Sequence, residues 1–477
     1  MKFTKIMMLA GAAGIATIGG AQAADLPSKK AAPVEYVRVC STYGAGFFYI
    51  PGTQTCIRIG GRARYEWHYA QPYARNDSTT GSRAIGRIFL DARTATEYGL
   101  LRAFVRYDVA RRIGQLRSGT GVRVGTAFDG TGNDFAGVAQ TQVDLNRAFV
   151  QLGGLLAGRS QSYFDFYAGD LELIGTTMGS SQTTNLLAYT ASFGGGFSAT
   201  LSIEDGVERR QRIFNATAGG PNIVGFGAPA NYSGSSMPDF VGVLRVEQGW
   251  GVAQLSGAVH QVRAVGATVV NGVTAIGFAP GTQYGYALNA GVKINLPMLA
   301  AGDQLWLQAT YAKGAMAYLV GNPCGQGSSG CFFGGVGGVN NITDAVVISN
   351  GGAGSLQLTS GWGITAAFLH YWTPTIRQGL FASYGQIDYG NGVSFAGNGY
   401  NTNFNGANSL RDSTYWTVGT NVIWSPVKDL DIGVEIDYLK AEVGNGGIFS
   451  NVTGTPLNRL TSSEDRIIGR FRIQRDF

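Results

Sequence analysis

The residues with the greatest capacity for covalent or metal chemistry are four cysteines and three histidines. The cysteines fall into two close pairs, Cys40 with Cys56 and Cys324 with Cys331. A zinc site would need further ligands beside such a pair, but none of the histidines lies beside one. An even number of cysteines in an exported chain indicates disulfides. We therefore expect two local disulfides and no metal site.

The sequence motifs of common enzyme active sites are absent. The chain has neither the G-x-S-x-G pattern that presents a nucleophilic serine nor the H-E-x-x-H pattern of zinc proteases. Its GGVGGV segment is not followed by the Lys-Ser/Thr pair of a phosphate-binding loop. We expect no enzymatic activity and no cofactor.

Arginines recur with a regular spacing. In the stretch CIRIGGRARYEWHYAQ (56–71), every second position is polar or glycine: Arg58, Gly60, Arg62, Arg64, Glu66 and His68. The positions between them are mostly apolar and end in Tyr65, Trp67 and Tyr69. A period of two marks a β-strand with two unlike faces. This strand needs apolar surroundings on one face and polar surroundings on the other.

The N-terminus and the composition indicate an exported, ordered protein. Residues 1–23 combine two lysines, an apolar run and a small-residue site ending at Ala23, which predicts a cleaved signal peptide. Of the 477 residues, 44% are hydrophobic and 14% charged, and glycine occurs 73 times without a Gly-X-Y repeat. This composition argues against disorder and collagen. The formal charge of +6 is interspersed along the chain, so we expect no nucleic-acid partner.

The alternation continues along the chain and predicts sixteen strands. They cover 57–69, 82–96, 100–112, 144–153, 161–168, 185–194, 196–205, 238–247, 251–263, 282–296, 304–319, 359–372, 379–388, 411–424, 430–443 and 464–477. Short turns such as EYG alternate with long loops rich in glycine, asparagine and serine. No later apolar run reaches the ~18 residues that a membrane helix needs.

An even number of amphipathic strands, with short turns on one side and long loops on the other, is typical of a bacterial outer-membrane barrel. We therefore predict an all-β, 16-stranded antiparallel transmembrane β-barrel over 57–477, preceded by an N-terminal segment over 24–56 that contains Cys40 and Cys56. Lipid would cover the apolar face of each strand, and water would cover the charged face. A closed sheet leaves no unpaired backbone edge in the hydrocarbon.

Two further features favour a barrel. Trp416 and Trp424 share one strand face, and eight residues at ~3.4 Å each separate them by roughly 27 Å. Strand tilt reduces this to about 21 Å along the membrane normal, near the ~25 Å between aromatic girdles. The chain ends on Phe477 after an amphipathic last strand, which resembles the signal that outer-membrane assembly machinery reads.

Four segments resemble the general porins of alphaproteobacteria (Rhizobiales type): VEYVRVCSTYGAGFFYIPGTQTCIRIGG, MPDFVGVLRVEQGWG, LWLQATY and the terminal RFRIQRDF. The resemblance covers the chain after the signal peptide. It implies a homotrimer of barrels in the outer membrane, in contact with lipid and lipopolysaccharide, that passes small hydrophilic solutes and ions. It also implies that the third loop folds into each pore.

Arginines on the predicted inner face gather on the first, second, third and last strands, which become neighbours when the barrel closes. We expect a basic wall of Arg58, Arg62, Arg64, Arg87, Arg93, Arg102, Arg106, Arg470 and Arg472. Asp165 on the fifth predicted strand, and Asp170 and Glu172 in the loop after it, would face this wall across the constriction. The alternative is that the arginines are solvated or paired with Glu66, Asp91 and Asp108 beside them.

Three other functions remain open. A substrate-specific channel, for sugars for example, would show aromatic residues inside the barrel, and Phe89 and Phe104 are the clear inward ones on the basic wall. An outer-membrane enzyme would need a catalytic constellation that the sequence does not show. An exported adhesin or lectin rich in β-structure would be soluble without detergent.

Overall fold

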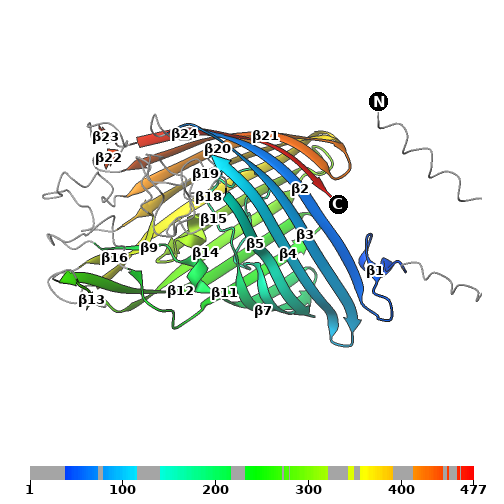
Figure 1. The fold of residues 1–477 in the computed structure, drawn as a ribbon, viewed down its shortest axis with the longest axis horizontal. Coiled ribbons are helices and arrows are strands. Elements are labelled where there is room, and N and C mark those ends of the chain that lie inside the picture. Colours follow the sequence, from blue (N-terminus) through cyan, green and yellow to red (C-terminus); the bar gives the residue numbers. More distant parts are fainter. Residues whose placement is uncertain are drawn as a thin grey trace, which may run out of the picture.

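The computed structural model describes residues 38–72, 79–114, 116, 140–215, 231–270, 273–278, 280–320, 342–348, 355–389, 412–443, 448–450, 459–461 and 463–477. Within these ranges, sixteen antiparallel strands form the barrel predicted from the alternation (Figure 1). They are β2 (Cys56–Ala70), β3 (Thr80–Thr96), β4 (Gly99–Gly114), β5 (Gln140–Leu152), β6 (Leu155–Gln161), β7 (Thr183–Gly194), β8 (Phe197–Glu204), β11 (Asp239–Gln248), β12 (Gly251–Val270), β14 (Thr282–Asn295), β15 (Gln304–Lys313), β18 (Ser360–Thr373), β19 (Ile376–Asp388), β20 (Ser413–Val427), β21 (Leu430–Val443) and β24 (Ser463–Asp476).

The barrel closes where its first long strand pairs with its last. β2 and β24 lie side by side in Figure 1 and pair from Arg62 opposite Asp476 to Ala70 opposite Ile468. The C-terminal residue extends this seam, because Phe477 exchanges backbone hydrogen bonds of 2.9 and 3.1 Å with Gly61. Closure satisfies the edges of both strands, as a sheet surrounded by hydrocarbon requires.

The two faces of the strands are those predicted. On β2, Trp67 is 44% exposed on the outer face, whereas the neighbouring Glu66 and His68 are buried on the inner face. Trp416 and Trp424 are both exposed on the outer face of β20, as expected for residues at two girdles. The register along β2 is therefore correct, since a slip by one residue would exchange the faces.

One predicted strand is misplaced and another is too long. The strand predicted over 161–168 overlaps β6 only at Gln161, because β6 begins at Leu155 and ends at Gln161. Ser162 then begins a turn, in which its Oγ accepts a hydrogen bond from the amide of Phe164 (3.2 Å) and its carbonyl accepts one from the amide of Asp165 (3.3 Å). The strand predicted over 304–319 ends at Lys313, because Gly314 adopts a positive φ of 63° that turns the chain. Apolar side chains follow in both segments, and they mimic a strand pattern although they pack inside the barrel.

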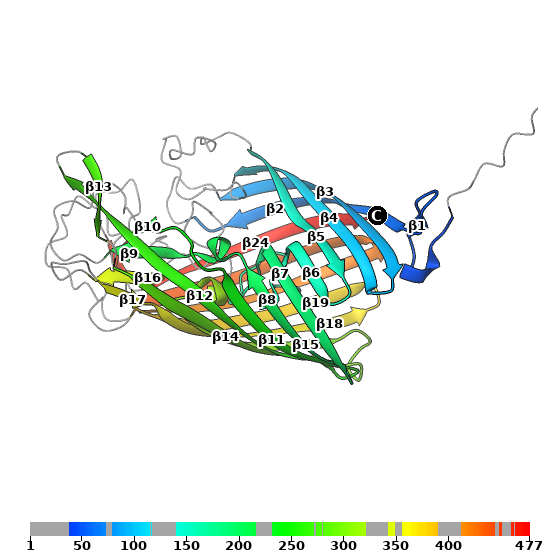
Figure 2. The same cartoon turned by 90° about the horizontal axis from the view of Figure 1, so that it is seen from below.

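Shorter elements accompany the barrel, and several gather at the end that carries the long loops. They are η1 (Ser41–Tyr43), β1 (Phe48–Tyr49), η2 (Gly206–Arg209), β9 (Arg212–Asn215), β10 (Asn231–Tyr232), β13 (Val273–Phe278), α1 (Ala317–Val320), β16 (Thr343–Ile348), β17 (Ser355–Leu358), β22 (Ile448–Ser450) and β23 (Arg459–Thr461). β9, β16 and β17 form a small sheet far from β1 (Figure 2). None of the helices in the described ranges is long and apolar enough to cross a membrane.

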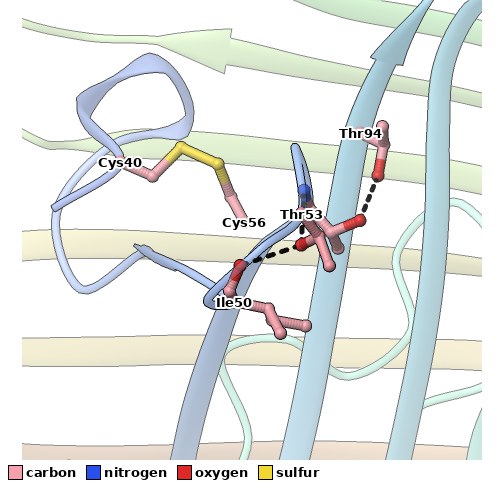
Figure 3. Close-up of a disulfide and its surroundings, with 6 residues drawn as sticks. Cys40, Ile50, Thr53, Cys56 and Thr94 are labelled. Atoms are coloured by element: carbon pink, nitrogen blue, oxygen red, sulfur yellow. Dashed lines mark hydrogen bonds between the residues drawn. A yellow bond between two sulfur atoms is a disulfide. The ribbon is translucent and has the colours of Figure 1, made fainter. Parts of the chain in front are cut away.

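Cys40 and Cys56 form the disulfide that we predicted, and it joins the N-terminal segment to the first residue of β2 (Figure 3). Both cysteines are buried, and β1 pairs with the start of β2. A hydrogen bond of 2.9 Å between the hydroxyls of Thr55 and Thr94 adds a contact to β3. Cys324, Cys331 and the predicted signal peptide over 1–23 lie outside the described residues.

Replacement of both Cys40 and Cys56 by serine should loosen the N-terminal segment and leave the barrel folded. A cross-link that closes a loop of about 15 residues is worth about 3 kcal/mol of chain entropy, and here that constraint acts on a segment with few other buried contacts. Limited proteolysis should cut the variant faster within 38–55, while the folded band on an unheated SDS gel persists. Loss of the folded band would show that the barrel itself depends on the disulfide.

Candidate functional site

The nine arginines expected to form the basic wall lie on four adjacent strands. The strand order β24–β2–β3–β4 places them on one side of the barrel, and the alternation turns them all toward the inside. These are Arg58, Arg62 and Arg64 on β2, Arg87 and Arg93 on β3, Arg102 and Arg106 on β4, and Arg470 and Arg472 on β24. Arginines outnumber carboxylates on these four strands, so the wall is basic.

Glu66 is the most heavily shared carboxylate of this wall. Its side chain is fully buried and accepts hydrogen bonds from Arg83 Nε (2.6 Å) on β3 and Arg472 Nε (2.7 Å) on β24. Nitrogens of Arg64 and Arg470 lie 3.7 and 3.9 Å from its Oε1. Four cations thus surround one anion at the closing seam. Arg83 was absent from the predicted wall, although it lies four residues before Arg87 on the same face.

Most other arginines of the wall are also paired. Arg87 forms a two-point ion pair with Asp108 on β4, with N–O distances of 2.7 and 2.6 Å. Arg93 and Arg102 share Asp91, each through two hydrogen bonds between 2.8 and 3.1 Å. Glu66, Asp91 and Asp108, the acids named as possible partners, therefore do pair with arginines.

Arg62 pairs with Asp476 across the seam. Arg58 has no carboxylate within 4.0 Å among the residues that the structure describes, and its guanidinium lies 5.6 Å from the ring centre of Phe89. Positive charge therefore remains on the inner surface after the ion pairs are counted.

Three phenylalanine rings stack beside these arginines. Phe89 and Phe104, both expected inside, have ring centres 5.9 Å apart, and Phe149 on β5 follows at 5.4 Å. The Arg102 guanidinium lies 5.1 Å from the Phe104 ring and 5.3 Å from the Phe149 ring. Phe149 was missed, although it follows the same alternation. These contacts hold the guanidinium of Arg102 against an apolar surface.

Residues 162–182, which we call loop 3, cross the interior from β6 to the opposite strands. Polar side chains on the inner faces of these strands bond to its backbone: Gln308 on β15, Thr365 on β18, Ser383 on β19, Thr417 and Asn421 on β20, and Glu435 on β21. Near the middle of loop 3, the carbonyl of Leu173 accepts hydrogen bonds from Arg470 Nη1 (2.7 Å) and from Arg472. Loop 3 therefore meets the wall at β24.

The three acids expected to face the basic wall are placed differently from one another. Asp165 lies in loop 3 rather than on a strand, and accepts hydrogen bonds from the Gln182 amide (2.8 Å) and from Ser180. Glu172 is buried and bonds to Thr176 and Thr177 within the same loop. Burial raises the pKa of the Glu172 carboxyl, against the opposing effect of those hydrogen bonds.

Asp170 is the exposed acid of the three. The bonds of Asp165 and Glu172 stabilise loop 3 itself. The contact between loop 3 and the arginines of β24 is made by a backbone carbonyl.

A second segment, 314–320, fills the interior beside loop 3. The amide of Gly179 in loop 3 donates to the Leu319 carbonyl (2.8 Å), and the rings of Phe164 and Tyr318 lie 4.7 Å apart. Met178, Met316 and Leu319 belong to the same buried cluster, which also includes side chains on the inner faces of β11, β14 and β15. On the side of the basic wall, by contrast, the side chains of Arg62, Arg93 and Arg472 remain 13–24% exposed.

A buried charge network joins the two inner segments. Arg209, 1% exposed, donates to Ser180 Oγ (2.6 Å) and lies 3.5 Å from Asp165 and 3.8 Å from Glu204. Its guanidinium also covers the Tyr318 ring at 4.0 Å. Sequence reasoning missed this network, because its members come from loop 3, η2, β8 and α1, and no local spacing connects them.

Comparison with known proteins agrees with this geometry. The profile of a family described as Porin subfamily matches residues 25–460. The chain belongs to this porin family. Porin Omp2b of Brucella canis and Porin Omp2b of Brucella abortus are both 32% identical over 254 residues, covering 52% of this chain and 63% of the relative. The match therefore spans less than two thirds of each relative's length, and it confirms the resemblance to alphaproteobacterial porins.

The fold is also similar to that of a solved outer-membrane protein. The outer membrane channel DcaP of Acinetobacter baumannii superimposes with a TM-score of 0.56 at 14% identity, over 90% of this chain and 99% of that one. This similarity supports the barrel architecture. The porin family and the apolar outer face together place the chain in the outer membrane.

Replacement of Glu66 by glutamine should destabilise the barrel strongly. It removes the one buried anion that four arginines surround, and a broken buried ion pair costs about 3–5 kcal/mol. Denaturant titration of the protein in lipid vesicles measures this loss. The matched control is Asp476→Asn, which breaks an ion pair whose acid is 42% exposed and should cost less than about 1 kcal/mol. Equal losses in the two variants would contradict the central place of Glu66.

Proposed function

We propose that the chain forms a passive, water-filled channel for small hydrophilic solutes and ions in the outer membrane. The observation that carries this proposal is the exposure of arginines inside the barrel: six ion-paired arginines of the wall, together with Arg83, keep 13–24% of their side chains accessible. Charged groups of this kind inside a barrel indicate water. A barrel of sixteen strands is also wide enough to leave an aqueous channel.

The narrowest part of the channel would lie between loop 3 and the basic wall. After β6, loop 3 bonds to strands from β15 to β21 and meets the basic wall at β24, so the remaining space is bounded by loop 3 and by β24, β2, β3, β4, β5 and β6. The basic side of this constriction comprises the nine arginines of the wall and Arg83. On the acidic side we propose Asp170, with Asp165 and Glu172 contributing their charge from within the loop. Opposite charges on the two sides would produce an electric field across the constriction. The low-dielectric walls of the barrel would concentrate that field.

We further propose that three copies assemble in contact with outer-membrane lipid and lipopolysaccharide, as the family resemblance implies. The broad apolar outer surface of the strands supports a membrane environment. The C-terminal Phe477, placed at the seam by its bonds to Gly61, is proposed as the assembly signal.

A sugar-specific channel is the second candidate, and the stack of Phe89, Phe104 and Phe149 is the observation in its favour. Sugars bind aromatic side chains through the ring face. Here the rings stack at interplanar angles of 23° and 22°, and guanidiniums cover further parts of their faces. Because the faces are already occupied, the general channel is favoured.

The deciding experiment is conductance in a planar bilayer. Detergent-purified protein should give large, stable steps in potassium chloride, in groups of three if trimers insert. A folded protein that gives no conductance would overturn the proposal. Block of the current by a neutral oligosaccharide at low concentration would favour the sugar-specific channel.

Removal of two wall charges should shift ion selectivity toward cations. A unit charge about 7 Å from a passing ion changes its energy by ~0.6 kcal/mol in water, or about threefold in permeability. We expect the double variant Arg58→Gln/Arg64→Gln to lower the anion-to-cation permeability ratio by at least this factor. The reversal potential under a salt gradient measures the ratio. Arg475→Gln is the control, because Arg475 lies on the outer face, where the same loss of charge should leave selectivity unchanged.

A further inference from the structure

Pairs of arginines stand directly opposite each other at four levels of the inner wall. They are Arg62 with Arg87 on β2 and β3, Arg93 with Arg102 on β3 and β4, Arg83 with Arg112 on β3 and β4, and Arg106 with Arg147 on β4 and β5. Like charges directly opposite each other on neighbouring strands destabilise a sheet. Each such pair therefore needs an anion nearby.

The first two pairs obtain that anion from the protein. Arg62 and Arg87 pair with Asp476 and Asp108, respectively. Arg93 and Arg102 both bind Asp91. Each guanidinium in these two pairs thus has a carboxylate partner, and in the third pair Arg83 binds Glu66.

Arg106 and Arg147 differ from the other three pairs, in each of which at least one arginine binds a carboxylate. Throughout the described part of the chain, no carboxylate oxygen lies within 4.0 Å of either guanidinium. Their partners are neutral amide oxygens instead: Arg106 Nη2 donates to Asn146, and Arg147 Nη2 donates to Gln161 Oε1 at 2.9 Å. The Nε atoms of both arginines lack a hydrogen-bond partner among the described residues. The amides hold the two side chains in position without neutralising them.

Apolar rings flank this pair on one side, and two carboxylates lie on the other side. On one side lie the stacked rings of Phe104 and Phe149, which are directly opposite each other two residues along the same strands. On the other side lie Asp108, already bound by Arg87, and Asp144 opposite it, whose contact is with Asn146 Nδ2 at 3.4 Å. An apolar neighbour lowers the local dielectric and strengthens a charge interaction.

We propose that Arg106 and Arg147 form a binding station for a phosphate group on the channel wall, which deepens and rests on the proposed channel function. Directly opposite residues on neighbouring strands have Cβ atoms about 5 Å apart, so these two side chains together present several N–H donors to one group. A phosphate carries a charge of about −1.5 to −2 at neutral pH and three or more acceptor oxygens, so it can neutralise both. A single carboxylate or a chloride ion has too little charge to do so. The group would belong to inorganic phosphate or to a small phosphorylated solute.

Channel block by phosphate tests the proposal. In a planar bilayer with potassium chloride, inorganic phosphate added to one side should reduce the current through the wild-type channel in a saturable manner. Arg106→Gln and Arg147→Gln should each raise the half-blocking concentration about tenfold, equal to about 1.4 kcal/mol. Arg147→Lys should retain part of the block, because it keeps the charge. Glycerol phosphate in place of inorganic phosphate distinguishes the two sources of the group.

The control is Arg111→Gln, which removes the same charge from β4 at an exposed position of opposite parity to Arg106, where Arg111 donates to Thr141. This variant should keep the wild-type block. An equal block in wild type and both glutamine variants would contradict phosphate binding at Arg106 and Arg147. The proposed channel function would still stand. Absence of any potassium chloride current from folded protein would instead overturn the channel. Calorimetric titration of detergent-solubilised protein with phosphate measures binding without relying on conductance. The mobility of each variant on an unheated SDS gel shows whether it is folded.

Discussion

The requirement that every backbone N–H and C=O group be paired within the hydrocarbon governs this structure. It is met by closing the sheet, with β2 against β24 and the terminal Phe477 bonded to Gly61. Closure creates an inside that lipid cannot reach, and the period of two then places alternate residues there. Most charged residues of β2, β3, β4 and β24 occupy that inside, because the outer face carries mainly apolar side chains.

Charged side chains inside the barrel need partners of opposite charge, and the junction of β2 with β24 provides an example. Glu66, the buried acid of β2, is shared by arginines of β3 and β24, so that its bonds cross both junctions of the first strand. Glu435 has a different task, since it accepts the amide of Leu173 and so holds loop 3 against β21. Buried carboxylates therefore act both as links between strands and as anchors for the loop.

The interior is unevenly filled, and this asymmetry explains the distribution of charge. Loop 3 and the segment 314–320 pack together against the inner faces of strands between β11 and β21 and form an apolar cluster. The buried Arg209 contacts both segments. The arginines of the wall lie on the other side, where Arg62, Arg93 and Arg472 keep part of their side chains exposed. On the filled side, the buried Arg209 is surrounded by Ser180, Asp165 and Glu204.

The sequence by itself determined the number of barrel strands, their faces, the seam between the first and last strands, and the pairing of Cys40 with Cys56. These features follow from local periodicity and short separations, which the chain expresses residue by residue. It did not determine where β6 begins and ends or what loop 3 contacts, because the apolar residues after Gln161 alternate as a strand would. The partners of Arg209 and of Glu435 were likewise invisible, since they come from segments far apart in the chain. Only the closed barrel, which brings those segments into one confined interior, decided which charges would meet.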